Sequence, residues 1–361
     1  IMTKMKLNRK VVVGHWQDER VIEKINIWTR VAAGSYVMKH MKVVRFGDNM
    51  RQVAVTDGDK VSAEMKFGFS VNTHGVGDLV EAINQVSDSQ IKQLVEEYES
   101  SYYMMPSLLH GGEKRSSLIE AARIELGISK FLKDGGFSAY TNTFEDLHGM
   151  RQLPGIGSQR MMMAGYGFGA EGDWKTAALL HVIKLMAEGL PGGNSFMEDY
   201  TYHFDPQNTM VLGSHMLEIC PSIANKKPSC EVHALGIGGK EDPVRLVFNV
   251  GSGPALNISL VDLGNRFRLI VNEVEAVEVN QEFPHLPTAR ALWKTKPDME
   301  LGLQGWILCG GAHHTVYSQN LTSEYMEDFA EMLNIEMLKI GEDTTLANLK
   351  NELKINELYY R

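Results

Sequence analysis

The chain has 361 residues, of which 43% are hydrophobic, so it is long enough for two domains that each bury a core. Its formal net charge of −9 disfavours binding to a nucleic-acid backbone, and its apolar stretches are too short to span a bilayer. No charged leader followed by an apolar core marks secretion. Cys220, Cys230 and Cys309 are widely spaced, which fits reduced thiols better than a disulfide framework or a zinc knuckle. We therefore expect a cytoplasmic protein without nucleic-acid or membrane partners.

The first half of the chain alternates between strand-like and helix-like patterns. Ser87 and Gln90 predict a capping box at the start of a helix, and Asp57-Gly58 predicts a hairpin turn. Predicted strands cover residues 10–14, 42–46 and 137–143, and predicted helices cover 18–33, 90–98, 116–133 and 174–188. This alternation favours a layered α/β domain with a largely parallel sheet.

The predicted elements become mostly short β-strands after residues 190–193. Short strands are predicted over 231–235, 243–250, 257–263 and 266–271, and helices over 323–333 and 345–355. Gly264-Asn265 predicts a hairpin between the last two strands. We therefore predict an α/β fold with two main parts. Residues 42–190 form a three-layer, nucleotide-fold-like domain with a parallel sheet, and residues 191–361 form a β-rich, barrel-like domain with helices.

A glycine-rich stretch contains a literal G-x-G-x-x-G at Gly167, Gly169 and Gly172, just before a predicted helix. This pattern can mark a dinucleotide-binding loop, which would indicate a nicotinamide-dependent oxidoreductase. We disfavour that interpretation because residues 159–163 predict a helix where the motif needs a strand, and because Glu171 places a carboxylate where a pyrophosphate would sit. The glycines then let the backbone turn tightly around an exposed acid. Glu171 is either a functional carboxylate or a solvated loop residue near a helix N-terminus, and the sequence leaves both open.

Two further stretches carry candidate side chains. Glu198 and Asp199 lie among aromatic residues, where desolvation raises the pKa of a carboxyl unless a cation is near. Such an acid suits a metal ligand or a general acid/base, although a surface turn is the simpler alternative. His215 lies in a short apolar run, where a histidine is more often a satisfied core residue than a ligand.

His313 and His314 follow an apolar run at 306–309 that predicts a strand. Adjacent side chains on an extended chain point to opposite faces, so we expect one of the two histidines to face a given site. Carboxylates combined with imidazoles suit Mn²⁺ or a similar divalent ion with open positions better than a structural zinc. The residues alone therefore indicate a metal enzyme and go no further.

Several motifs together resemble the L-arabinose isomerase family, in the same order and over nearly the whole chain. They cover residues 12–18, 45–51, 144–149, 169–176, 195–204, 236–243 and 310–315. The resemblance implies that Mn²⁺, or another divalent ion such as Co²⁺, is held by Glu171, Glu198, His215 and His314. It also implies that Glu171 and Glu198 form the acid/base pair, and that Phe144, Met216 and Ile237 line the sugar pocket.

The resemblance implies an aldose–ketose isomerisation. A proton moves between C1 and C2 of an open-chain sugar through an ene-diol, converting L-arabinose to L-ribulose and, by the same chemistry, D-galactose to D-tagatose. A divalent ion would stabilise the charge that develops on the two sugar oxygens. The resemblance further implies a homo-oligomer, since family members assemble as hexamers built from trimers.

One departure from the family pattern concerns the start of the chain. Residues 1–41 resemble only the end of the family's N-terminal nucleotide-fold domain, so most of that domain is expected to be absent. In the family it reaches into a neighbouring subunit's active site and supplies polar sugar contacts. The alternatives are therefore a non-catalytic remnant that binds metal or sugar, and an isomerase for another aldose such as fucose.

Overall fold

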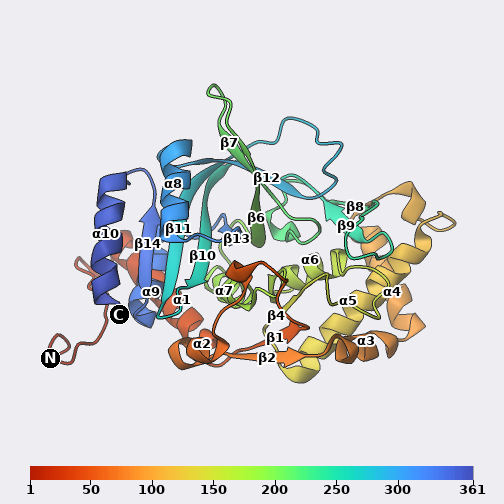
Figure 1. Cartoon of the computed structure of the whole chain (residues 1–361), viewed down its shortest axis with the longest axis horizontal. Helices are drawn as coiled ribbons and strands as arrows, with labels where there is room; N and C mark the ends of the chain where they lie inside the picture. Colours follow the sequence, from red (N-terminus) through yellow and green to blue (C-terminus); the bar gives the residue numbers. More distant parts are fainter. Residues whose placement is uncertain (361) are drawn as a thin grey trace.

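The computed structural model describes residues 1–360 and contains a four-stranded parallel sheet (Figure 1). Its strands lie in the order β2 (Ser70–His74), β1 (Lys42–Phe46), β4 (Ala139–Asn142) and β5 (Gly167–Gly169). All three pairings are parallel, so the carboxyl ends of the strands lie at one edge of the sheet. The predicted parallel α/β sheet is confirmed, and ligands of such sheets bind outside this edge.

Helices lie around this sheet, some packed on its strands and others on neighbouring helices. They are α1 (Glu19–Met38), α2 (Lys60–Phe67), α3 (Val76–Asn84), α4 (Asp88–Ser101), α5 (Arg115–Gly135), α6 (Ile156–Met163) and α7 (Trp174–Met186). Phe131 of α5 contacts Phe46 of β1 with ring centroids 4.9 Å apart, while α7 packs against β1, β4 and β5. The predicted capping box of α4 is confirmed, because Ser87 and Gln90 each accept the other's backbone N–H.

The second half of the chain builds a closed ring of six strands. They are β6 (Asn194–His203), β7 (Met210–Ser214), β12 (Arg290–Thr295), β11 (Phe267–Val277), β10 (Gly253–Asp262) and β13 (His314–Ser318). Each strand pairs with the next, and β13 pairs back to β6, so the ring has no free edge. The predicted barrel-like part and the β10–β11 hairpin are thereby confirmed.

The remaining elements surround this ring. They are β14 (Glu336–Ile340), which pairs parallel with β11, the small sheet of β3 (Tyr103–Met104), β8 (Ser229–Val232) and β9 (Val244–Val247), the helices α8 (Met299–Cys309), α9 (Ser323–Leu333) and α10 (Leu346–Tyr359), and the 3-10 turns η1 (Ala54–Thr56), η2 (Pro106–Leu108) and η3 (Pro221–Ile223).

Helix α7 joins the parallel sheet to the barrel. It contacts β4 and β5 of the sheet as well as β6, β10 and β13 of the barrel, so it lies between them (Figure 1). One continuous hydrophobic core includes Phe168 of β5, Leu180 of α7, and Phe196 of β6. The loop that leads from β5 into α7 is consequently placed where the carboxyl edge of the sheet meets the barrel.

Two sequence predictions near the start of the chain are wrong. Residues 10–14 form no strand, and Val11 and Val13 are 72% and 88% exposed, because a valine run becomes a strand only where a sheet offers it hydrogen-bond partners. Asp57-Gly58 does not turn a hairpin. It leads into α2, where Asp59 caps the helix by accepting the backbone N–H groups of Val61 and Ser62.

The prediction of a strand at residues 306–309 is also wrong. These residues form the end of α8, which stops at Gly310 in a left-handed conformation with φ 82°. A four-residue apolar run fits a buried helix end and a buried strand equally well, so its pattern alone could not decide between them.

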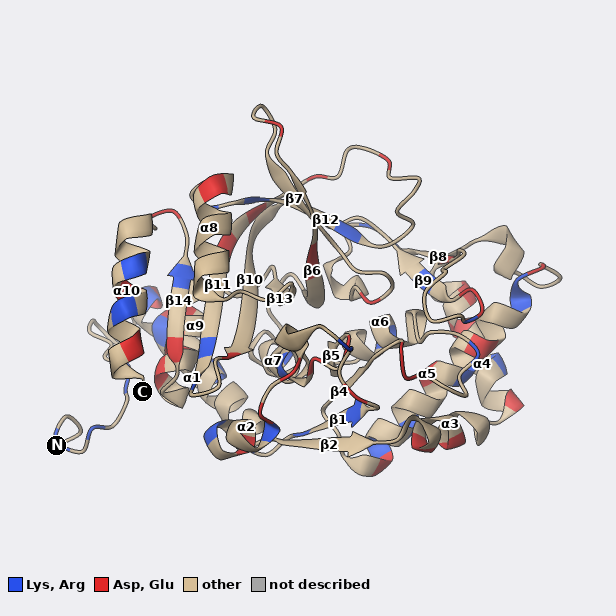
Figure 2. Cartoon of the chain, viewed as in Figure 1, with Lys and Arg blue, Asp and Glu red and all other residues tan. Residues whose placement is uncertain are grey.

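Acidic and basic residues are interspersed over the outer helices (Figure 2). Within residues 1–360, no helix is both long and apolar enough to cross a membrane.

Candidate metal centre

Glu171 lies in the loop between β5 and α7, with an unusual backbone conformation. Its φ of 59° is left-handed, a region that costs a side-chain-bearing residue about 1 kcal/mol or more. Neighbouring hydrogen bonds hold it there: Met50 N–H donates to the Glu171 carbonyl at 3.0 Å, and Gly172 N–H donates to the Asn142 carbonyl at 3.1 Å. The side chain is only 18% exposed, so the expectation of an exposed acid is wrong. The loop turns this carboxylate inward.

His215 follows the end of β7 and is buried. Its Nδ1 lies 2.6 Å from Oε2 of Glu218, three residues further along the chain. Burial lowers the pKa of His215, but the hydrogen bond and the charge of Glu218 outweigh it, and the pKa is raised overall. The histidine expected to be a core residue therefore carries a buried ionic partner.

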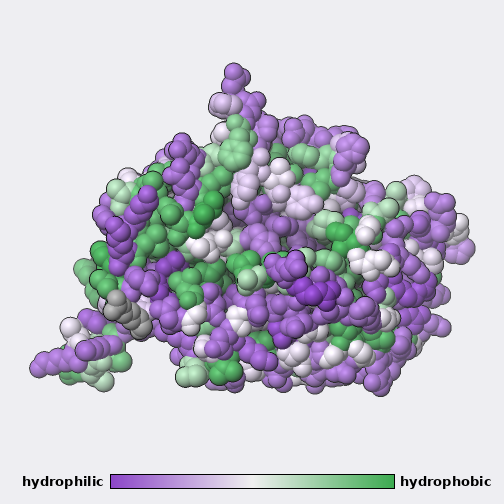
Figure 3. All heavy atoms as spheres, in the orientation of Figure 1, coloured by the Kyte–Doolittle hydropathy of each residue, from purple (hydrophilic) through white to green (hydrophobic). Residues whose placement is uncertain are grey.

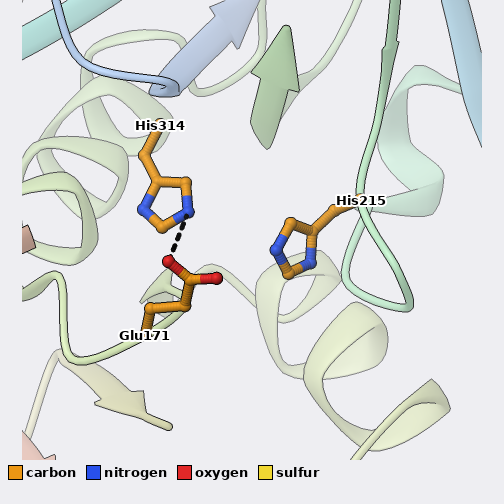
Figure 4. Close-up of side chains that lie close together, drawn as sticks. All are labelled: Glu171, His215 and His314. Atoms are coloured by element: carbon orange, nitrogen blue, oxygen red, sulfur yellow. Dashed lines mark ion pairs between the residues drawn. The ribbon is translucent and has the colours of Figure 1, made fainter. Parts of the chain in front are cut away.

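His314 is the first residue of β13 and has no exposed surface. Its Nδ1 lies 3.3 Å from Oδ2 of Asp173, and its Nε2 lies 3.7 Å from Oε2 of Glu171 (Figure 4). The second distance is too long for a hydrogen bond, so Nε2 is a buried nitrogen without a hydrogen-bond partner. Burial lowers the pKa of His314, which favours the neutral ring.

Glu171, His215 and His314 together form a group that could hold a metal ion. Each offers one ligand atom, and these atoms all lie within 4.8 Å of one another. In Figure 4 the two imidazoles and the carboxylate converge from different elements on a shared space. A divalent ion there would satisfy the unpartnered Nε2 of His314, and two nitrogens with a carboxylate are donors that first-row divalent ions accept. The residues therefore fit a metal ion.

Glu198 lies near the group of Glu171, His215 and His314 but is not one of its members. It lies on β6 directly opposite His314 in the strand register and opposite Ser214, the neighbour of His215. Directly opposed residues of antiparallel strands project to the same face, so Glu198 shares a face with His314. Its charge helps to raise the pKa of His215. The assignment of Glu198 as a fourth ligand stays a prediction.

The acidic neighbour of Glu198 behaves as the sequence indicates. Burial raises the pKa of Asp199 to about 6, and the side chain accepts a hydrogen bond from Tyr202.

Both of the paired histidines lie close to Glu171, although only His314 belongs to the converging group. Nε2 of His313 lies 3.4 Å from Oε2 of Glu171, and the rings of His313 and His314 have centroids 4.0 Å apart. Strand alternation does not apply because His313 precedes β13. Burial lowers the pKa of His313, but the hydrogen bond with Glu171 raises it overall. Burial raises the pKa of Glu171, yet its histidine neighbours outweigh that effect and lower it.

The glycine motif is explained by close packing of β5 on α7. A Cβ on Gly167 would lie 2.0 Å from the carbonyl oxygen of Ala177, and one on Gly169 would lie 2.2 Å from that of Asp173. Only glycine allows such approach of a strand to a helix. Asp173 caps α7 by accepting the backbone N–H of Thr176. The helix N-terminus is thus already paired with a carboxylate.

Comparison with known proteins gives the family. Three family models match: the L-arabinose isomerase N-terminal domain over residues 1–40, the central domain over 42–189 and the C-terminal domain over 193–336. Proteins named L-arabinose isomerase are 59% identical over 360 residues in Flavobacterium johnsoniae, 57% over 361 in Escherichia fergusonii and 56% over 361 in Klebsiella pneumoniae. Each alignment covers 100% of this chain and 72% of the relative.

The chain belongs to the L-arabinose isomerase family. It is therefore an isomerase, and the resemblance drawn from its motifs is confirmed.

The three side chains predicted to line the sugar pocket of this L-arabinose isomerase homologue are half-buried. Phe144 follows β4, and Met216 follows His215 and accepts the Tyr200 hydroxyl at 3.4 Å. Ile237 lies in the loop after β8, where a Cβ on its neighbour Gly238 would lie 3.3 Å from the Phe144 carbonyl oxygen. Their sugar contacts stay a prediction.

The sequence did not predict two residues that contact the histidines of the group, Asp173 and Glu218. Neither stands out as a candidate in the sequence, yet each contacts Nδ1 of a histidine of the group. The signal for Glu218 was its spacing of three residues from His215. No comparable local signal existed for Asp173, because His314 is 141 residues away.

Proposed function

We propose that the chain catalyses aldose–ketose isomerisation of L-arabinose to L-ribulose, and of D-galactose to D-tagatose, with Mn²⁺ or a similar ion such as Co²⁺. The observation that carries the proposal is the convergence of Glu171, His215 and His314 in a member of the L-arabinose isomerase family. Relatives bearing that name supply the substrate class. The three donors supply a place for the ion.

The side chains of the candidate metal centre would have the following roles. His215 and His314 would hold the ion through their Nε2 atoms, with Glu171 and Glu198 as carboxylate ligands. When bound, a divalent ion polarises the sugar oxygens on C1 and C2 and stabilises negative charge between them. Because the pKa of Glu171 is lowered, this carboxylate is ionised near neutral pH and is ready to accept a proton.

The proton transfer needs a base that reaches C2 and an acid that reaches C1 of the sugar. One of Glu171 and Glu198 removes the proton from C2, which leaves an ene-diol, and a carboxyl group returns a proton to C1. The hydroxyl proton on O2 moves to O1, so the atoms balance and no external oxidant is needed. Phe144, Met216 and Ile237 are proposed to line the sugar pocket and to set which aldose is accepted.

Isomerisation through an ene-diol has an isotopic signature. In D₂O the proposal expects deuterium from solvent on C1 of L-ribulose, because the carboxyl group exchanges its proton before returning it. Solvent deuterium at C1 would exclude a direct hydride shift, and its absence together with full activity of Glu171→Gln would overturn the acid/base role of the glutamates.

Ketose formation by purified protein with Mn²⁺, in a panel of L-arabinose, D-galactose and L-fucose, tests the activity itself. Glu171→Gln is expected to abolish turnover, whereas Glu64→Gln, on an exposed position of α2, is the matched control and keeps it. Preference for L-fucose would change the substrate. No ketose from any sugar by wild type would leave a binding remnant and contradict the proposal.

We also propose that the protein acts as a homo-oligomer in the cytoplasm. Figure 3 shows apolar side chains gathered around α8, and Ile307 of α8 is 74% and Leu358 of α10 66% exposed. A second copy covering them would remove that surface from water. Light scattering of wild type and Ile307→Glu tests the assembly, and a monomeric wild type would contradict it.

The proposed cytoplasmic location is supported by the three cysteines, which are free and buried, as fits a reducing compartment.

A further inference from the structure

Each histidine of the candidate metal centre contacts its own buried carboxylate through Nδ1. Glu218 Oε2 lies 2.6 Å from Nδ1 of His215, and Asp173 Oδ2 lies 3.3 Å from Nδ1 of His314. Asp173 is 1% exposed and Glu218 7% exposed, so water does not compete for either contact. The two carboxylates come from different parts of the fold, the cap of α7 and the segment after β7.

These contacts determine which ring nitrogen carries the hydrogen. An ionised carboxylate can only accept a hydrogen bond, so Nδ1 of each histidine must donate. In a neutral imidazole the other nitrogen, Nε2, then has a free lone pair. For His314 that atom is the buried nitrogen without a hydrogen-bond partner, 3.7 Å from Glu171. The lone pairs are thus available on the side where Glu171 lies.

We propose that Asp173 and Glu218 are positioning residues that fix His314 and His215 in the tautomer and orientation required to bind a metal ion. The inference rests on the metal site proposed above and adds two residues that do not touch the ion. Such outer partners of metal-binding histidines typically change metal affinity roughly 10- to 100-fold when they are replaced.

The two carboxylates differ in how firmly they are held. Asp173 Oδ1 accepts the Thr176 backbone N–H at 3.1 Å and lies 3.5 Å from the Lys175 ammonium, while Oδ2 accepts the Thr176 hydroxyl at 2.7 Å. Within residues 1–360, the bond to His215 is the one hydrogen bond of the Glu218 side chain. Asp173 is therefore fixed in rotation, whereas the end of Glu218 can turn.

This difference makes amide substitutions informative. In Asp173→Asn the amide oxygen stays at the Oδ1 position, because the reverse orientation would place NH₂ against the Thr176 N–H and the Lys175 ammonium. The NH₂ group then faces His314 and donates to Nδ1, which moves the ring hydrogen to Nε2 and blocks binding. In Glu218→Gln the amide can turn its oxygen toward His215 and keep the tautomer.

Titration of Mn²⁺ into metal-free protein, followed by the electron paramagnetic resonance of the free ion, tests the inference. Asp173→Asn is expected to raise the Kd for Mn²⁺ roughly 10- to 100-fold while α7 stays capped. Glu218→Ala is expected to raise it comparably, and Glu218→Gln to restore most of the loss. Glu125→Gln is the matched control: this buried carboxylate pairs with Arg160 and Tyr98, so its loss lowers stability without changing the Kd.

The possible outcomes distinguish a failure of the positioning role from a failure of the proposed metal site. Tight Mn²⁺ binding by wild type with an unchanged Kd in Asp173→Asn would overturn the positioning role alone. Equal losses in Glu218→Gln and Glu218→Ala would also overturn it, because charge rather than tautomer would then matter. Absence of Mn²⁺ binding by wild type would overturn the metal site and the inference together. Melting curves of each metal-free variant identify any that do not fold.

Discussion

At the scale of single residues, Glu171 combines a costly backbone conformation with an inward-facing carboxylate. Comparing Glu171→Gly with Glu171→Gln separates the two, because both remove the acid and only glycine removes the left-handed strain. We expect both variants to lose turnover, and the metal-free glycine variant to be more stable than the glutamine variant by about 1 kcal/mol. Urea unfolding measures the difference. Equal stabilities would contradict the strain, and retained activity in either would remove Glu171 from the reaction.

The two adjacent histidines are expected to differ as ligands. His314 is fully buried with an unpartnered Nε2, whereas the side chain of His313 is 31% exposed and lies outside the converging group. His314→Ala should therefore weaken Mn²⁺ binding more than His313→Ala. Calorimetric titration of both metal-free variants provides the comparison, and equal or reversed losses would refute the assignment.

His215 gives the site a pH dependence of defined sign. Its pKa is raised above the ordinary value, and an imidazolium cannot bind a cation. Mn²⁺ binding is therefore expected to release a proton, and affinity should fall as the pH is lowered through the raised pKa of His215. Calorimetry in two buffers with different ionisation enthalpies counts the protons. A pH-independent Kd without proton release would contradict the account.

At the scale of secondary-structure elements, the helix ends were the most predictable features because their signals are local. Ser87 and Gln90 lie three residues apart and satisfy each other's backbone N–H groups, so their pattern implies their structure. The strands were less predictable, since the valines at 10–14 have no partner strand and the apolar run at 306–309 ends a helix. Neither environment can be seen in a short window of sequence.

The capping box offers a test confined to one element. Ser87→Ala removes the side chain that accepts the Gln90 N–H, and we expect a loss of about 1 kcal/mol in the free energy of unfolding. Turnover should be unchanged because α4 lies at one end of the molecule, away from α7 and β13, at which the metal centre lies (Figure 1). Urea unfolding and a ketose assay check both parts, and a stability equal to that of wild type would show that the cap contributes nothing.

At the scale of the whole molecule, the site exists because the parallel sheet and the barrel meet at α7. Glu171 comes from the carboxyl edge of the sheet, while His215 directly follows barrel strand β7 and His314 begins barrel strand β13. Residues alone indicated these acids and histidines as candidates, but nothing in their spacing placed them together. The family resemblance supplied the grouping. The contacts of Asp173 and Glu218 required the folded chain.

A preformed metal site has a consequence for global stability. An ion that binds only the folded state stabilises it by about 2.7 kcal/mol when present at 100 times its Kd. EDTA should therefore lower the Tm of the protein, and added Mn²⁺ should restore it. Differential scanning calorimetry measures the shift, and the His314→Ala variant is the control that should not respond. An unchanged wild-type melting curve would count against the site.

The most direct test of metal-dependent isomerisation is a titration of metal-free protein with Mn²⁺ while L-ribulose formation from L-arabinose is followed. The account predicts no product in EDTA, and a rate that rises with Mn²⁺ until each chain holds one ion. L-Ribulose formed at the same rate in EDTA, or none formed at saturating Mn²⁺, would contradict it.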